Sequence, residues 1–189
     1  KVGNGDVLIG AAAAVAEYQG VANASHVREK LTEMVHLNET LYACGIACSD
    51  EGTRTAAGNY LVSVLLANVC KQNVTRFPYE IARLAQDIAE GLLGTMPSEA
   101  DFASEEVGPW CRKFLAAAVP AEERRRMLRL IEAMTMGALA VGYLVESMHG
   151  AGSPQTQRIV IQRQADLEGK KALARRLCGI EPDPFLPEG

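Results

Sequence analysis

The residues best suited to chemistry lie between Glu146 and Arg158, in the run Glu-Ser-Met-His-Gly-Ala-Gly-Ser-Pro-Gln-Thr-Gln-Arg. Glu146 and His149 are three positions apart, which places a carboxylate and an imidazole on one face of a helix. Two glycines then let the backbone turn sharply, and Ser153 and Pro154 suit the N-cap and first position of a second helix. Because a helix start offers free N–H groups and a positive dipole end, the pattern predicts an anion or phosphate seat beside an acid–base pair. The same residues also fit a plain glycine-ended helix followed by a proline-started one.

A second Glu-x-x-His pair, Glu33 and His36, allows an alternative in which the chain holds two metal ions. Ferritin-like bundles use two such pairs and one inward glutamate from each of two further helices. The candidates for those glutamates are Glu17, Glu80 and Glu90. Glu146 and His149, however, come at the end of their predicted helix, whereas a di-metal site needs ligands near the middle of the bundle. We therefore expect no metal site in this chain.

The five cysteines give no metal-ligand pattern either. Cys44 and Cys48 are four apart on a predicted helix but have no second cysteine pair, so we interpret them as small core residues. An odd number of cysteines with no signal peptide indicates reduced thiols in a cytoplasmic protein.

Composition is that of a globular protein, with 48% hydrophobic and 22% charged residues and a net charge of −4. The negative charge argues against a nucleic-acid partner, and no apolar run reaches the roughly 18 residues of a membrane span. Lys1 is not a methionine and leads directly into a helix, so we expect a fragment or a processed piece of a longer protein.

Hydrophobic spacing predicts an all-α fold, because stripes recur at helical intervals and aromatic residues make up only 5% of the chain. We expect helices over 6–19 with Asp6 as cap, from Ser25 to Gly52, over 59–93, from Pro109 to Val119, from Pro120 to Met148, and over 155–177. Residues 53–58 and 94–108 are predicted to be loops, and the extended tail over 182–189 suits docking on a neighbouring molecule. Four long and two shorter helices indicate an up-and-down helical bundle.

Five polar residues interrupt the most apolar of these helices, in the run Lys-Gln-Asn-Val-Thr-Arg over 71–76, and Pro78 follows. Proline usually kinks or breaks a helix. Since buried polar groups need partners, this segment should either pair across a subunit interface or face a ligand.

Four segments of the chain resemble the C-terminal region of the 4-hydroxybutyryl-CoA dehydratase/vinylacetyl-CoA Δ-isomerase family. They are Ala-Ser-His-Val-Arg-Glu-Lys-Leu-Thr-Glu-Met-Val-His-Leu-Asn-Glu-Thr-Leu-Tyr (24–42), Ala-Asn-Val-Cys-Lys-Gln-Asn-Val-Thr-Arg-Phe-Pro-Tyr-Glu (67–80), Met-Pro-Ser-Glu-Ala-Asp-Phe (96–102) and Glu-Ser-Met-His-Gly-Ala-Gly-Ser-Pro (146–154). A wider group with the same resemblance includes the flavin-dependent 4-hydroxyphenylacetate 3-hydroxylases, which share the acyl-CoA dehydrogenase architecture.

The resemblance implies that residues 1–189 form the C-terminal helical bundle domain, of the acyl-CoA dehydrogenase type, of a larger flavoenzyme whose upstream domains are absent. Members of the family are homotetramers that hold FAD and a [4Fe–4S] cluster in each active site. They convert the acyl-CoA substrate 4-hydroxybutyryl-CoA to crotonyl-CoA and move the double bond of vinylacetyl-CoA. Lys1 matches the lysine that follows a cluster-binding cysteine, so the cluster ligands are expected outside this chain.

The resemblance also assigns the catalytic group. Glu146 matches the family's proposed catalytic carboxylate, and we expect an apolar surrounding that disfavours its charged form and suits it to proton transfer. His149 is placed to share that proton, and Lys1 joins the catalytic residues through its match beside the cluster.

The cofactor residues come from two segments. In acyl-CoA dehydrogenases the turn resembling 150–157 contacts the ADP half of the flavin, and the glycine-rich segment resembling 90–96 reaches FAD from an adjoining subunit. The residues carried over are Gly152, Ser153, Gln155, Gly91, Gly94 and Thr95. His26 stands where such families place an FAD-contacting aromatic residue. Arg76 is assigned on its chemistry, as a charge partner for the pyrophosphate or for a neighbouring subunit. The segment 103–108 is shorter than the family's loop.

Two other functions remain open at this point. The chain could belong to a flavin-dependent aromatic hydroxylase of the same fold, or it could be a non-catalytic helical oligomerisation module. The presence of cluster cysteines before Lys1 would separate the dehydratase from the hydroxylase, and a tetramer that takes up no flavin would indicate the module.

Overall fold

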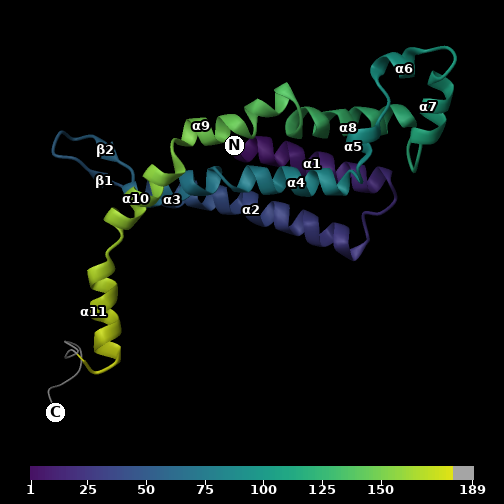
Figure 1. Cartoon of the computed structure of the whole chain (residues 1–189). Coiled ribbons are helices and arrows are strands. Elements are labelled where there is room, and N and C mark those ends of the chain that lie inside the picture. Colours follow the sequence, from purple (N-terminus) through teal and green to yellow (C-terminus); the bar gives the residue numbers. More distant parts are fainter. Residues whose placement is uncertain (181–189) are drawn as a thin grey trace.

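Four helices form the centre of the molecule and contain most of its buried apolar side chains. They are α1 (Val2–Tyr18), α2 (Ser25–Asp50), α4 (Phe77–Ile88) and α8 (Ala121–Thr135). The computed structural model describes residues 1–180, and in it α1 packs against each of the other three helices (Figure 1). The larger core side chains with no exposed surface include Leu8, Val15, Met34, Ile81, Leu128 and Ile131. The all-α helical bundle predicted from the sequence is confirmed.

A polar contact fixes α1 against α2. Asn38 is 1% exposed, and its Nδ2 donates to Asp6 Oδ1 at 2.7 Å and to the Val2 carbonyl at 3.3 Å. A Cβ on Gly5 would lie 2.1 Å from Asn38 Oδ1, so only glycine fits where the helices meet. The prediction that Asp6 caps the first helix was wrong. The helix begins at Val2, and Asp6 instead accepts the Asn38 hydrogen bond from within it.

The segment after α2 is a small hairpin and not the predicted loop and helix start. Strands β1 (Thr53–Arg54) and β2 (Tyr60–Leu61) pair antiparallel and protrude from the bundle (Figure 1). The Tyr60 hydroxyl donates to the Ser49 carbonyl at 2.7 Å, which anchors the hairpin on the end of α2. The aromatic and β-branched residues of 60–62 favour a strand, and this preference outweighs their continuity with the helix that follows.

The predicted long helix over 59–93 is divided at the polar segment. Helix α3 (Val64–Val74) ends before Thr75, and α4 begins at Phe77 with Pro78 in its first turn. The proline therefore produces the interruption that the sequence predicted. Within the segment, Thr75 is 7% exposed and its hydroxyl donates to the Gln72 carbonyl at 2.7 Å, whereas Arg76 faces solvent.

Two further predicted helices are also interrupted. The helix expected to run to Met148 ends at Thr135, and Gly137 takes a positive φ of 66°. A 3₁₀ turn, η1 (Ala138–Gly142), and helix α9 (Val145–Ala151) follow. The helix expected over 155–177 is divided into α10 (Pro154–Gln164) and α11 (Leu167–Leu177), with the Asp166 side chain capping the second.

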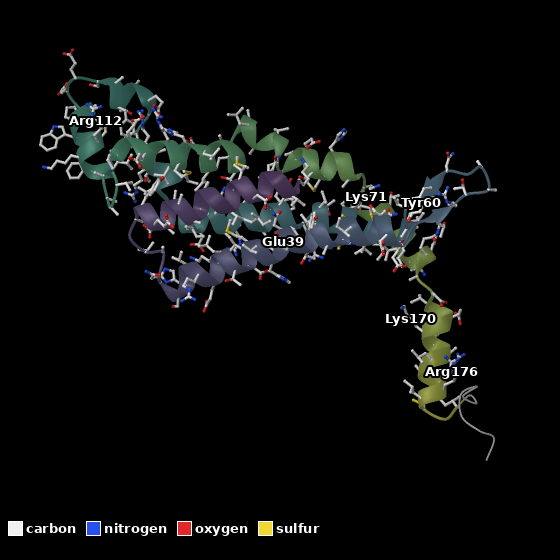
Figure 2. The ribbon with its side chains drawn as sticks, turned by 180° about the vertical axis from the view of Figure 1, so that it is seen from behind. Glu39, Tyr60, Lys71, Arg112, Lys170 and Arg176 are labelled. Carbon is white, nitrogen blue, oxygen red and sulfur yellow. The ribbon has the colours of Figure 1, made fainter. Side chains whose placement is uncertain are left out.

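Short helices and an arm occupy the two ends of the bundle. At one end lie α5 (Leu92–Thr95), α6 (Glu99–Ala103) and α7 (Gly108–Leu115), so part of the predicted loop over 94–108 is helical. At the other end α10 packs on α3, and α11 projects away from the body (Figure 1). Figure 2 shows Lys170 and Arg176 on this arm and Arg112 at the opposite end. The predicted tail over 182–189 lies outside the described residues.

Within residues 1–180, no single helix has the length and apolar composition needed to cross a bilayer, although α8 together with the 138–151 segment passes that test as a bent pair.

Candidate functional site

The turn between α9 and α10 has the geometry that the sequence predicted. Helix α9 ends at Ala151, and Gly152 follows with φ 84°, a left-handed value that favours glycine. The Ser153 hydroxyl accepts a hydrogen bond from the Thr156 N–H at 3.4 Å, and Pro154 is the first residue of α10. The turn therefore presents the exposed start of an 11-residue helix, where N–H groups and the positive dipole end favour an anion.

A buried glutamine holds this turn in place by hydrogen bonds. Gln157 is 2% exposed, and its Nε2 donates to the Ala151 carbonyl at 2.7 Å and to the Gly152 carbonyl at 3.0 Å. Nothing in the sequence distinguished Gln157 from Gln155, which is exposed two positions earlier. Burial of a polar side chain on an otherwise polar helix depends on how α10 packs on α3, and spacing does not encode that packing.

Glu146 lies on α9 and is paired with the first residue of the chain. Lys1 Nζ donates to Glu146 Oε2 and also to the Gly142 carbonyl at 2.8 Å. The hydrogen bond from Lys1, together with its charge, lowers the pKa of the Glu146 carboxyl, and His149 adds to the effect. The structure thus brings together Lys1 and Glu146, two of the residues assigned to catalysis.

We expected an apolar environment around Glu146, and this prediction was wrong for this chain. The carboxylate is 56% exposed, and a cation contacts it directly, so its charged form is favoured. His149 is exposed on the same helix one turn later.

The opposite face of α9 is fixed in the protein interior. Ser147 has no exposed surface, and its hydroxyl donates to the Tyr143 carbonyl. Tyr143 is 3% exposed, and burial raises the pKa of its phenol, so it remains neutral. With its inner face held in this way, α9 directs Glu146 and His149 outward.

The second group of predicted cofactor residues lies at the other end of the bundle. Gly91 precedes α5 with φ 74°, and Gly94 and Thr95 lie within that short helix, all exposed. His26 is exposed in the first turn of α2, which begins at the same end (Figure 1). Helices α5 and α10 are far apart in Figure 1, so one chain does not bring these residues to the α9–α10 turn.

Arg76 belongs to neither group. It lies at the α3–α4 break and lines an open cleft of about 490 Å³ together with Leu37, Phe77, Tyr79, Glu80 and Arg83. Its neighbour Glu80 accepts two hydrogen bonds from Arg83, at 2.9 and 2.7 Å, which lower the pKa of that carboxyl. The cleft is therefore a charged surface on the side of the bundle, and a role for Arg76 at the flavin stays a prediction.

The described part of the chain has no group of metal-binding side chains that would support the di-metal alternative. Within residues 1–180, no three His, Cys, Asp or Glu side chains come close enough together to hold a metal ion. Glu33 and His36 are exposed on α2. Burial, together with the thiols of Cys44 and Cys48 on α2, raises the pKa of Cys70 on α3 and keeps its thiol protonated.

The fold, with its exposed turn between α9 and α10, is that of a helical domain of the acyl-CoA dehydrogenase-like type. The model of the family described as "HpaB: 4-hydroxyphenylacetate 3-hydroxylase C terminal" matches residues 1–179, and the chain belongs to this family.

Two curated relatives and two solved structures show where the chain lies within that group. The 4-hydroxybutyryl-CoA dehydratase/vinylacetyl-CoA-Delta-isomerase of Clostridium aminobutyricum is 63% identical over 191 residues, which cover 96% of this chain and 39% of that protein. The 4-hydroxyphenylacetate 3-monooxygenase oxygenase component of Thermus thermophilus is 30% identical over 137 residues, covering 72% of this chain and 28% of that protein. The resemblance predicted from the sequence is confirmed.

The solved structures give the same order of similarity. An oxygen-tolerant archaeal 4-hydroxybutyryl-CoA dehydratase from N. maritimus superposes with a TM-score of 0.89 at 59% identity, over 97% of this chain and 37% of that one. The HpaB oxygenase component in complex with FAD and 4-hydroxyphenylacetate superposes with a TM-score of 0.82 at 25% identity, over 93% of this chain and 37% of that one. This chain therefore spans less than two fifths of the length of each of these relatives.

Proposed function

We propose that this chain is the flavin-binding, tetramer-forming C-terminal domain of a cytoplasmic 4-hydroxybutyryl-CoA dehydratase/vinylacetyl-CoA Δ-isomerase that converts 4-hydroxybutyryl-CoA to crotonyl-CoA. The observation that carries the proposal is the 63% identity to the dehydratase over 96% of the chain, against 30% to the Thermus hydroxylase component over 72%. The domain comprises residues 1–189, and the remaining domains and the ligands of a [4Fe–4S] cluster lie outside it.

FAD is the cofactor that the exposed turn suits, and the related HpaB structure was solved with FAD. The residues at the turn fit the ADP half of such a nucleotide. A Cβ on Gly152 would meet nothing within 4 Å, so the space beside its backbone is open to a phosphate, and Ser153 and Gln155 are exposed next to it. A flavin held by these residues would supply the electron transfer for the dehydration. Gly91, Gly94, Thr95 and His26 would approach the same cofactor from a neighbouring copy.

Glu146 is the proton-handling group of this proposal. Glu146 pairs with Lys1 and is ionised, which is the form in which a carboxyl group can accept a proton from the acyl-CoA substrate. His149 shares the exposed face of α9 and would pass that proton on, while Lys1 keeps the carboxylate in place through its second bond to the Gly142 carbonyl.

The test is a Glu146→Gln substitution in the intact enzyme. Loss of a general base reduces turnover by about 10²–10⁴-fold. We expect that loss with unchanged flavin content, because in this proposal Glu146 would contact the substrate and not the ADP half of the cofactor. Glu123→Gln, on the exposed side of α8, serves as control and should retain full rate. Turnover of the Glu146→Gln enzyme at the wild-type rate would remove Glu146 from catalysis.

A flavin-dependent 4-hydroxyphenylacetate 3-hydroxylase-type monooxygenase is the second candidate, favoured by the family model and by the TM-score of 0.82 to HpaB. Assaying the intact protein with 4-hydroxybutyryl-CoA and with 4-hydroxyphenylacetate separates the two. A third candidate, the non-catalytic oligomerisation module, predicts tetramers that take up no flavin.

A further inference from the structure

Gln157 is the one side chain of α10 that is fully buried, although it is polar and lies one turn from the proposed flavin seat. We propose that Gln157 is a positioning residue that sets the shape of the α9–α10 turn and thereby the affinity of the seat for the flavin. This inference rests on the function proposed above and deepens it, because it names the residue that holds the seat in its binding conformation.

The first observation is the pair of hydrogen bonds that Gln157 makes. Its amide nitrogen has two N–H groups, and they reach the carbonyls of Ala151 at 2.7 Å and Gly152 at 3.0 Å. The last carbonyls of a helix lack partners within that helix. Gln157 supplies those partners from the next helix, so it joins the end of α9 directly to the start of α10.

The assignment of the amide is fixed by chemistry. With the oxygen and nitrogen exchanged, Gln157 would place an acceptor against two carbonyl acceptors. The Nε2 atom must therefore face Ala151 and Gly152, which leaves Oε1 on the other side. Oε1 is buried and has no hydrogen-bond partner in the described part of the chain. Within residues 1–180, the Gln157 side chain is thus held by the two hydrogen bonds that its amide nitrogen donates to the turn.

The second observation is the backbone that these bonds hold. Gly152 has φ 84° and ψ −176°, so its carbonyl direction sets where Ser153 and the first turn of α10 point. The Gly152 N–H donates to the His149 carbonyl at 3.2 Å, and the Gln157 N–H donates to the Ser153 carbonyl at 3.1 Å. Together with the two hydrogen bonds from the Gln157 side chain, these bonds link the end of α9 to the first turn of α10.

The direction of the α10 N–H groups in the proposed flavin seat depends on these hydrogen bonds. Without the Gln157 donors, the two carbonyls would turn toward water, and Gly152 has no Cβ to restrict that rotation. The N–H groups of α10 would then lose their fixed direction toward a phosphate.

The experiment compares Gln157→Met with wild type in the intact protein, because methionine matches glutamine in length and lacks the donors. Gln162→Met, on the exposed side of α10, is the matched control. FAD affinity is measured by titrating the apoprotein, at a temperature where circular dichroism shows every variant fully folded. Loss of two hydrogen bonds that hold the seat should weaken FAD binding on the order of tenfold or more in Gln157→Met only.

A double-substitution cycle separates positioning from general destabilisation. Gly152→Ala distorts the same turn, because alanine disfavours φ 84°. If both changes act on one turn, the double variant should lose less FAD affinity than the product of the two single losses. Independent losses would contradict the proposal, and so would an unchanged FAD affinity in Gln157→Met. If Gln157→Met and the size-matched Gln157→Glu both fail to fold, Gln157 is a core residue and the inference is overturned. If wild type itself binds no flavin, the proposed function fails instead.

Discussion

The ammonium group of Lys1 contacts the Glu146 carboxylate and favours its charged form. A carboxylate in contact with a lysine stays ionised to lower pH than a free one, and the direction of the pKa shift agrees. Any contribution of this pair to stability is present above the unfolded pKa of Glu146 and is lost as the pH falls through the lowered, folded pKa. Both the base role proposed for Glu146 and its dependence on Lys1 can therefore be tested by pH.

Lys1→Gln in the intact enzyme should raise the pKa of Glu146 toward its ordinary value. Since a base works only when it is ionised, the acid-side limb of the kcat/KM profile should move to higher pH. The measurement is the pH–rate profile of both proteins. Superimposable acid limbs would show that Lys1 does not control the charge of Glu146 in the assembled enzyme.

Gly5 and Gly10 on α1 form a matched pair for the contact between α1 and α2. A Cβ on Gly5 would lie 2.1 Å from Asn38 Oδ1, whereas a Cβ on Gly10 would meet nothing within 4 Å. Gly5→Ala should lower the unfolding free energy by about 1–3 kcal/mol through overpacking. Gly10→Ala should raise it by about 0.5–1 kcal/mol, because alanine is the better helix former. Urea unfolding of the two variants measures both effects, and equal changes would contradict the packing at Asn38.

At the scale of the elements, one arginine ties α8 to the segment that precedes α6. Arg129 donates to Glu132 at 2.6 Å, to Glu99 at 3.0 Å and to the Pro97 carbonyl at 2.5 Å. The guanidinium serves three acceptors in different directions, which a lysine ammonium on a flexible chain does poorly. This link fixes the segment that connects α5, which contains Gly94 and Thr95, to α6.

Arg129→Lys should therefore speed hydrogen exchange over residues 97–103 and lower stability by about 1 kcal/mol. Arg126→Lys is the control, because Arg126 is 79% exposed and its one ion-pair partner within residues 1–180 is Glu122. Its effect should stay within about 0.5 kcal/mol. Equal exchange in the two variants would show that Arg129 does not anchor the segment.

The success of sequence-based prediction differed between elements for physical reasons. Helix α2 was predicted almost to the residue, since its apolar stripe repeats at a helical interval from Val27 to Leu41. The α9–α10 turn was predicted because glycine, serine and proline each have a strong local preference. The break near Gly137 was missed because the apolar pattern continues through it, and only a positive φ marks it. The pairing of Lys1 with Glu146 and the burial of Gln157 depend on tertiary packing, which no local pattern records.

At the scale of the whole molecule, the two groups of predicted flavin residues lie at opposite ends of one elongated chain (Figure 1). The turn at 152–155 and the glycines near α5 can meet one cofactor only if a second copy brings its α5 end to the first copy's turn. The proposed tetramer would provide this arrangement. The arm α11, which has no buried residue, is available for contacts between copies.

A comparison of two leucines tests the division between bundle and arm. Leu128 in α8 has no exposed surface, whereas Leu177 at the end of α11 is 80% exposed. Leu128→Ala should lower the unfolding free energy by about 2–5 kcal/mol. Leu177→Ala should change it by less than about 0.5 kcal/mol in the isolated chain. Chemical denaturation measures both, and a large loss from Leu177→Ala would show that α11 packs on the body.

The most direct test of the flavin seat is an experimental structure of the intact protein with FAD bound. We expect pyrophosphate oxygens within about 2.7–3.2 Å of N–H or hydroxyl groups of residues 152–155 in one copy. Gly91 and Gly94 of a second copy should lie beside the same cofactor, and the Gln157 hydrogen bonds should be intact. A flavin bound elsewhere, with the α9–α10 turn covered by protein, would contradict the central claim.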